Sequence, residues 1–285
     1  MRMTILRCGN LAREVNFTAA NDVFDLSEAP TRQELKPIDA IAREVLPVDP
    51  TPSLDEIAMQ PDVAHLGTPG PAPQPVPDPW RIVVIGTDAS LSAVLTRLMR
   101  ADNLWAEIGF VPVGPSLAAT NWGIPSLVDD SLRLATEGVV EPAPLIRDDT
   151  AVAVAGSATV TDWDDKEISA EVIVDDDVIL RHAAGPRTPA RGVFGAKLVP
   201  MTDAPGLAAV VADTPIHEVP ARGLGRLLGR TAPHGTAVAA TLKTGRALQA
   251  GGENLRIEVD GVSRKRPVDR VTFYRHLRDL QIVRP

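Results

Sequence analysis

The stretch Arg81-Ile-Val-Val-Ile-Gly-Thr-Asp-Ala-Ser90 decides the fold. Its run Ile82 to Ile85 is continuously apolar and rich in β-branched residues, which is typical of a central parallel strand covered on both faces. Gly86 ends the run, and a helix capped by Ser90 or Ser92 is expected next, because apolar residues recur at helical spacing: Leu91, Val94, Leu95 and Leu98. A strand, a glycine turn and a helix N-terminus direct free N–H groups at one spot, so this turn predicts a phosphate-binding site.

A second strand and helix follow this first unit. Glu107 to Val113 reads as a strand, a loop of small residues runs from Gly114 to Asn121, and a helix is expected around Ser126 to Thr136. The loops after the two strands should meet at the carboxyl edge of one parallel sheet, where open α/β sheets bind ligands. The region therefore predicts a small parallel α/β domain of the nucleotide-binding type.

Short apolar runs separated by turn residues fill the rest of the chain and predict an antiparallel β-sandwich domain. The expected strands are 151–155, 168–174, 178–180, 192–199, 207–211, 236–242 and 255–260. A glycine-containing helix with three arginines four residues apart is expected at 221–230.

The residues before this α/β region are expected to be partly ordered. The run 3–6 resembles a strand for a sheet edge, and 37–46 and 54–59 resemble short helices. Proline then occupies every second position from Pro69 to Pro79, which forces an extended chain. We therefore expect an N-terminal segment (1–67), a proline-rich linker (68–80), the α/β domain (81–137) and the antiparallel β domain (138–285). A return of the last strands to the first domain is an open alternative.

Composition limits the classes of protein. The 44% hydrophobic content supports globular cores, and no apolar run approaches the roughly 20 residues that span a bilayer. A single cysteine, Cys8, excludes an internal disulfide and a cysteine-built zinc site, which favours the cytoplasm.

Charge is distributed unevenly along the chain, whose net charge is -8. Residues 221–285 carry 13 basic against 5 acidic side chains, so this basic region either meets a lipid or anionic membrane surface or neutralises the acidic remainder. The first alternative implies peripheral membrane association. A protein partner could instead dock on the acidic residues 1–67. Few aromatic residues accompany the basic ones, so no specific nucleic-acid binding is expected.

Four motifs in this order resemble those of the diacylglycerol kinase and sphingosine kinase-like lipid kinases, over roughly residues 80–285. The family's Gly-Gly-Asp-Gly-Thr loop is matched by Gly86-Thr-Asp-Ala-Ser90, and its second glycine loop by Pro112-Val-Gly-Pro-Ser116 before Gly123-Ile-Pro125. Its acidic turn resembles Pro200 to Leu207, and its late Asp-Gly-Glu resembles Asp260-Gly-Val262.

The resemblance implies a nucleotide-contacting set and two acidic groups. The nucleotide-contacting residues would be Gly86, Thr87, Asp88, Ala89, Ser90, Gly114 and Ser116. Asp260 would be the general base and Asp88 would help to position a metal or an acceptor, with ATP and Mg²⁺ as cofactors if the chain is active. From the residues alone, Asp88 can equally cap a helix, and Asp260 can equally form an Asp-Gly hairpin turn.

Departures from the family pattern lead to the prediction for function. Thr87 and Ala89 stand where two loop glycines are expected, Val262 replaces a glutamate, and Ala204 and Pro205 replace paired aspartates, so no metal site is expected there. We therefore expect a lipid-kinase fold with eroded ATP and metal motifs, serving as a non-catalytic (pseudokinase-like) binding or regulatory module. An active ATP-dependent lipid kinase and an assembly subunit docking through residues 1–67 are the alternatives, so whether the chain is an enzyme is left open, as are the lipid and the oligomeric state.

Overall fold

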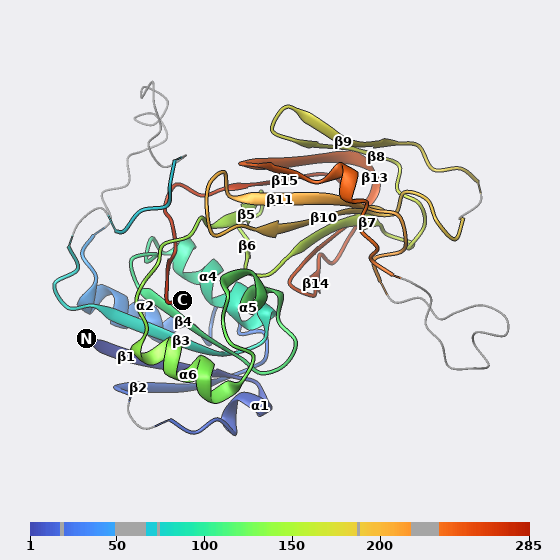
Figure 1. Cartoon of the computed structure of the whole chain (residues 1–285). Coiled ribbons are helices and arrows are strands. Elements are labelled where there is room, and N and C mark those ends of the chain that lie inside the picture. The colour runs from blue at the N-terminus through green and yellow to red at the C-terminus, as the bar shows by residue number, and fades with distance from the viewer. Residues whose placement is uncertain (18–19, 49–66, 73–74, 187–188, 218–233) are drawn as a thin grey trace. The chain divides into compact units, whose positions relative to one another are not determined.

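The computed structural model describes residues 1–17, 20–48, 67–72, 75–186, 189–217 and 234–285 (Figure 1). By its internal contacts the chain divides into two compact units. The α/β unit comprises Met1–Gly156, Pro200–Gly206 and Arg275–Pro285, and the β unit comprises Ser157–Val199 and Leu207–Tyr274. The domain boundaries at 67, 80 and 137 stay a prediction. The helices expected at 54–59 and 221–230 lie outside the described residues.

The α/β unit is built on a five-stranded parallel sheet with the strand order β16-β4-β3-β1-β2 (Figure 1). Its elements are β1 (Arg2–Cys8), α1 (Asn10–Arg13), β2 (Asp22–Leu26), α2 (Lys36–Val45), β3 (Trp80–Gly86), α4 (Asp88–Arg100), β4 (Glu107–Pro112), α5 (Leu117–Trp122), α6 (Val128–Glu137), the hairpin β5 (Ile146–Asp148) and β6 (Ala153–Val154), and β16 (Gln281–Ile282). The strands and helices predicted at 81–101, 107–113 and 126–136 are confirmed, but the loop expected at 114–121 contains most of the helix α5. β1 lies inside the sheet, between β3 and β2, so its expected place at the sheet edge is wrong.

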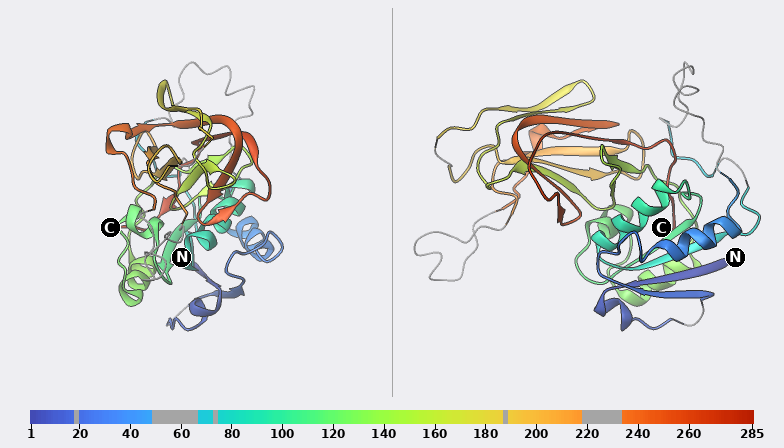
Figure 2. Two further views of the ribbon diagram at one scale, coloured as in Figure 1. Left: turned by 90° about the vertical axis from the view of Figure 1, so that its right-hand side faces the viewer. Right: turned by 180° about the vertical axis from the view of Figure 1, so that it is seen from behind.

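Helices cover both faces of this sheet, so successive residues of its central strands are buried on opposite sides. Ile82 and Val84 of β3 pack in one cluster with α2, α4 and α5, whereas Val83 and Ile85 pack in another with α1 and α6. Two further views of the ribbon show how the helices flank the strands (Figure 2). The continuous apolar run of β3 is thus explained by burial on both faces.

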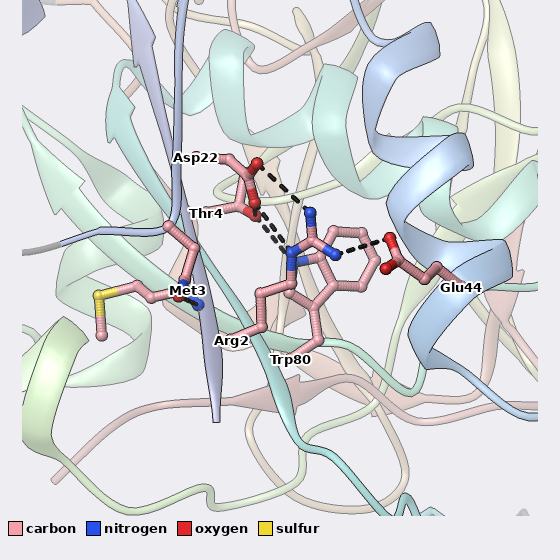
Figure 3. A network of polar contacts seen from close by, with 7 residues as sticks. Arg2, Met3, Thr4, Asp22, Glu44 and Trp80 are labelled. Carbon is pink, nitrogen blue, oxygen red and sulfur yellow. Dashed lines mark hydrogen bonds and ion pairs between the residues drawn. The ribbon is translucent and has the colours of Figure 1, made fainter.

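A polar network ties β1 to its neighbours at the start of the strand (Figure 3). The Arg2 guanidinium pairs with Asp22 of β2 at 2.9 Å and with Glu44 of α2 at 2.8 Å. The indole N–H of the buried Trp80 donates to Thr4 Oγ1 at 2.9 Å. Arg2 and Trp80 therefore connect β1 to β2, α2 and β3 at this end of the sheet.

The β unit is built on an antiparallel sheet in which the strands β12-β11-β10-β7-β13-β15 are neighbours in this order. Its strands are β7 (Ala158–Asp162), β8 (Ala170–Val174), β9 (Asp177–His182), β10 (Gly195–Pro200), β11 (Leu207–Ala212), β12 (Lys243–Gly245), β13 (Ala247–Val259), β14 (Val262–Ser263) and β15 (Val268–Arg275). The long strand β13 pairs with β8 along its first half and with β7 and β14 along its second half. The predicted fold class, a parallel α/β region followed by antiparallel β structure, is confirmed.

One predicted strand of the β unit is wrong. Within 236–242, Ala237 makes an isolated β-bridge to Ala212 and Ala239–Thr241 form a short 3-10 helix, so the segment is not a strand. Thr241 Oγ1 accepts the amide of Val211 at 2.9 Å, so the segment caps the end of β11 and β12 pairs with that strand instead.

Candidate functional site at the carboxyl edge of the parallel sheet

The adjacent parallel strands β1 and β3 are connected to strands on opposite sides of the sheet. From β1 the chain runs through α1 to β2 on one side, and from β3 it runs through α4 to β4 on the other. Because α1 and α4 pack on opposite faces, the turns after β1 and β3 diverge at the carboxyl edge. In open α/β sheets such a switch point is where a ligand crevice forms.

The turn after β3 is closed by its own side chains. Thr87, not Ser90 or Ser92, is the N-cap of α4: its hydroxyl accepts the Ser90 amide, while Ser90 Oγ accepts the Thr87 amide at 3.0 Å. Ser90 Oγ also donates to the carbonyl of Glu28 at 2.6 Å. A Cβ on Gly86 would lie 2.5 Å from Ser90 Oγ, so the glycine is required by this packing. The half-buried Ala89 follows in the first turn of α4.

The Asp88 carboxylate is bonded to the second predicted loop. Its Oδ1 accepts the Ser116 hydroxyl, and its Oδ2 accepts the backbone amides of Leu117 at 2.8 Å and Ala118 at 3.2 Å. Ser116 is the N-cap of α5 and its Oγ accepts the Ala119 amide at 2.9 Å. The structure thus brings Asp88 and Ser116 together, and Asp88 caps α5 rather than its own helix.

A groove of about 700 Å³ opens beside these loops. Gly114 lies in its lining with φ 142° and nothing within 4 Å of a Cβ built on it. The walls come from α1, from the turn after β4 and from the start of α6. Two carboxylates that the sequence prediction missed, Glu14 and Asp129, line it. No local motif signals them, because they lie more than a hundred positions apart in the chain.

Below the Gly86 turn lies Cys8, whose thiol is almost completely buried. Burial raises the pKa of Cys8 to about 12, and the nearby Glu34 acts in the same direction. The thiol is therefore neutral at physiological pH, and as a thiol it is a poor nucleophile.

Glu34 organises the loop after β2, whose Glu28 carbonyl receives the Ser90 hydroxyl. Its carboxylate accepts the amides of Thr31 at 2.8 Å and Ser27 at 2.9 Å, and the Thr31 hydroxyl at 2.7 Å. These hydrogen bonds, that of the Thr31 amide first, lower the pKa of Glu34 from 4.5 to about 2. The charged form is the one that stabilises the loop.

Glu34→Gln tests this effect through the dependence of stability on pH. Since the pKa of Glu34 is lower in the folded state, its contribution is complete above pH 4.5 and is lost as the pH falls toward 2. We expect the urea midpoint of the unmodified chain to fall across this window, and that of Glu34→Gln to start lower and to change less. The control is Glu28→Gln, an exposed neighbour, which should follow the unmodified chain. Identical pH profiles for Glu34→Gln and the unmodified chain would contradict the assignment.

Asp260 lies in the β unit, in the hairpin turn between β13 and β14, where Val259 pairs with Val262. Asp260 and Gly261 have φ values of 50° and 80°, as an Asp-Gly type I′ turn requires. The Asp260 carboxylate accepts the Ser157 amide at 2.9 Å, and the Asp260 amide donates to the Ser157 carbonyl at 2.9 Å. The role of Asp260 as a general base stays a prediction, while its alternative role as a hairpin residue is what the backbone displays.

The fold and these loops define a two-unit class, a doubly wound parallel α/β sheet joined to an antiparallel β sheet. No known protein family and no curated protein matches the chain. Among solved structures, it is similar to a diacylglycerol kinase from Bacillus anthracis, with 10% identity over 72% of this chain and 76% of that chain and a TM-score of 0.47. It is also similar to an NAD kinase from Archaeoglobus fulgidus in complex with ATP (14% identity, 73% and 82% covered, TM-score 0.41) and to yeast NADH kinase complexed with NADH (9%, 100% and 84%, TM-score 0.44). At these scores the similarities assign no activity to the chain.

No helix among the described residues is long and apolar enough to cross a membrane. No group of three or more histidine, cysteine, aspartate or glutamate side chains suited to a metal ion occurs in that part of the chain.

Proposed function

We propose that this chain is a lipid-kinase-like protein that acts as a binding or regulatory module and does not transfer phosphate from ATP. The observation that carries the proposal is the position of the Asp88 carboxylate against the backbone amides of Leu117 and Ala118. Phosphate groups bind where such amides are free, and here a carboxylate of the same charge sign already accepts them.

The turn after β3 supports the same conclusion. A triphosphate chain needs backbone approach and unshared donors, but the Thr87 side chain caps the start of α4 and the Ser90 hydroxyl is shared with Glu28. A magnesium ion needs carboxylate oxygens that are available to it. Both Asp88 oxygens accept hydrogen bonds from Ser116 and α5. The residues at this edge therefore do not fit ATP with Mg²⁺.

Nucleotide binding is the experiment that decides the proposal. We expect calorimetry and thermal unfolding of the full chain to show no response to ATP with Mg²⁺ up to millimolar concentration. A ligand at 100 times its Kd stabilises a protein by about 2.7 kcal/mol, which thermal unfolding detects readily. ATP-dependent stabilisation, or phosphorylation of diacylglycerol vesicles, would overturn the proposal in favour of an active lipid kinase.

Asp88→Ala tests whether the carboxylate is a structural cap. We expect it to lower the free energy of unfolding by about 2 kcal/mol, because the amides of α5 lose a charged acceptor. The loss should be the same with and without Mg²⁺, measured by urea unfolding. The control, Asp176→Ala, removes an exposed carboxylate from a hairpin turn and should change stability by less than about 0.5 kcal/mol. A Mg²⁺-dependent difference between Asp88→Ala and the unmodified chain would instead favour a metal-positioning role.

Cytoplasmic localisation, peripheral membrane contact and a partner docked through residues 1–67 belong to the same proposal. Residues 2–45 supply β1, β2 and α2, so a partner would meet the outer side of the edge strand β2. Pull-down experiments with full-length chain carrying substitutions on that strand would test this docking.

A further inference from the structure

The groove at the carboxyl edge has an acidic and apolar lining. Val15, Val113 and Val128 form part of its apolar wall, and the carboxylates are those of Glu14 and Asp129. Among the residues that the structure describes, the lining contains no lysine or arginine. Its volume of about 700 Å³ lies within the range of small-molecule sites.

Neither groove carboxylate has a neutralising partner in the part of the chain that the structure describes. Within the described ranges, Glu14 and Asp129 make no ion pair and their carboxylates accept no hydrogen bond, whereas the neighbouring Asp130 pairs with Arg133 at 2.8 Å. The N-terminus of α6 adds roughly half a positive charge, which is smaller than the full negative charge of Asp129 in its first turn. The two charged side chains of the groove lining are therefore both negative, which favours a cation over phosphates and carboxylates.

We infer that this groove binds a small organic cation, an amine or guanidine carried on an apolar body. The apolar walls would cover the body of the ligand, and the two carboxylates would receive its N–H groups as charge-assisted hydrogen bonds. Gly114 leaves the groove unobstructed, since a side chain there would project from the lining. The inference rests on the proposed function, because the turn after β4 lines the groove and also carries Ser116, which bonds to Asp88.

Three probes of equal length and different charge test the inference: hexamethylenediamine, hexanediol and adipate. We expect the diamine to bind most tightly and adipate to bind least, by calorimetry at low salt and by amide chemical shifts that move at Val113 and Gly114. Glu14→Gln and Asp129→Asn should each weaken diamine binding about threefold, and raised salt should weaken it further. The matched control is Asp130→Asn, one position along α6 and outside the groove lining, which should leave binding unchanged.

Each outcome separates this inference from the proposed function. Adipate binding as well as the diamine, or diamine binding that is insensitive to both groove substitutions, overturns the organic-cation site and leaves the absence of ATP binding untouched. ATP binding with normal diamine binding overturns the proposed function and leaves the cation site standing. Glu14 and Asp129 are exposed, so neither substitution should unfold the chain. Circular dichroism of both variants checks that a loss of binding does not come from unfolding.

Discussion

Arg81→Met is expected to lower the free energy of unfolding by about 3 kcal/mol, the lower end of the range for a broken buried ion pair. The Arg81 side chain is only 7% exposed and pairs with Glu107 at 2.7 Å. It also donates to the carbonyl of Thr136 at 2.9 Å, in the last turn of α6. That turn has no basic residue of its own, so Arg81 of β3 supplies the cation that the helix C-terminus favours. Glu107 is 20% exposed, which limits the cost of leaving it unpaired.

Urea unfolding followed by tryptophan fluorescence measures this loss. The control is Arg133→Met on α6 itself, whose pair with Asp130 has side chains 71% and 42% exposed and should contribute less than about 1 kcal/mol. Replacing both partners, Arg81→Met with Glu107→Leu, should recover part of the loss, because no unpaired charge remains. Equal losses for Arg81→Met and Arg133→Met would contradict the assignment.

The strands and helices that sequence patterns predicted correctly are those with burial on both faces or a clear amphipathic period. Ile82 to Ile85 and the helix after them belong to this class. β13 was predicted only from residue 255, because Gly251 and Gly252 interrupt its pattern, and the structure has an irregularity in pairing there. β15 was missed because most of its first residues are polar and face outward.

The candidate site was less predictable, because its contacts join distant parts of the chain. The local pattern shows that Asp88 can cap a helix, but not that the helix is α5, which begins 29 residues later. Similarly, the Ser90 hydroxyl reaches Glu28 across 62 positions. Glu14 and Asp129 share a groove only because α1 and α6 cover the same face of the sheet. Sequence periodicity locates such loops at one edge, whereas the partner of each side chain follows from tertiary packing.

The C-terminal return to the parallel sheet depends on a buried ion pair. Arg275 is fully buried and pairs with Asp279, 10% exposed, at 2.8 Å. The same side chains hold the segment before β3, since Arg275 donates to the Gly67 carbonyl at 2.8 Å and Asp279 accepts the Gly70 amide at 3.1 Å. The proline-rich stretch is thus fixed at its beginning to the chain that leads into β16.

Arg275→Met should therefore cost about 4 kcal/mol, because it leaves the Asp279 carboxylate buried without its cation. Urea unfolding measures the loss, and amide hydrogen exchange at Gly70 should become faster than global unfolding explains, since its acceptor is no longer positioned. The double variant Arg275→Met with Asp279→Leu removes both charges and should recover part of the stability, although Gly70 stays unprotected. Arg284→Met is the control, because Arg284 bonds to the Glu141 carbonyl at 3.2 Å at an exposed position. If Arg275→Met is no more costly than Arg284→Met, the ion pair does not hold the C-terminal return in place.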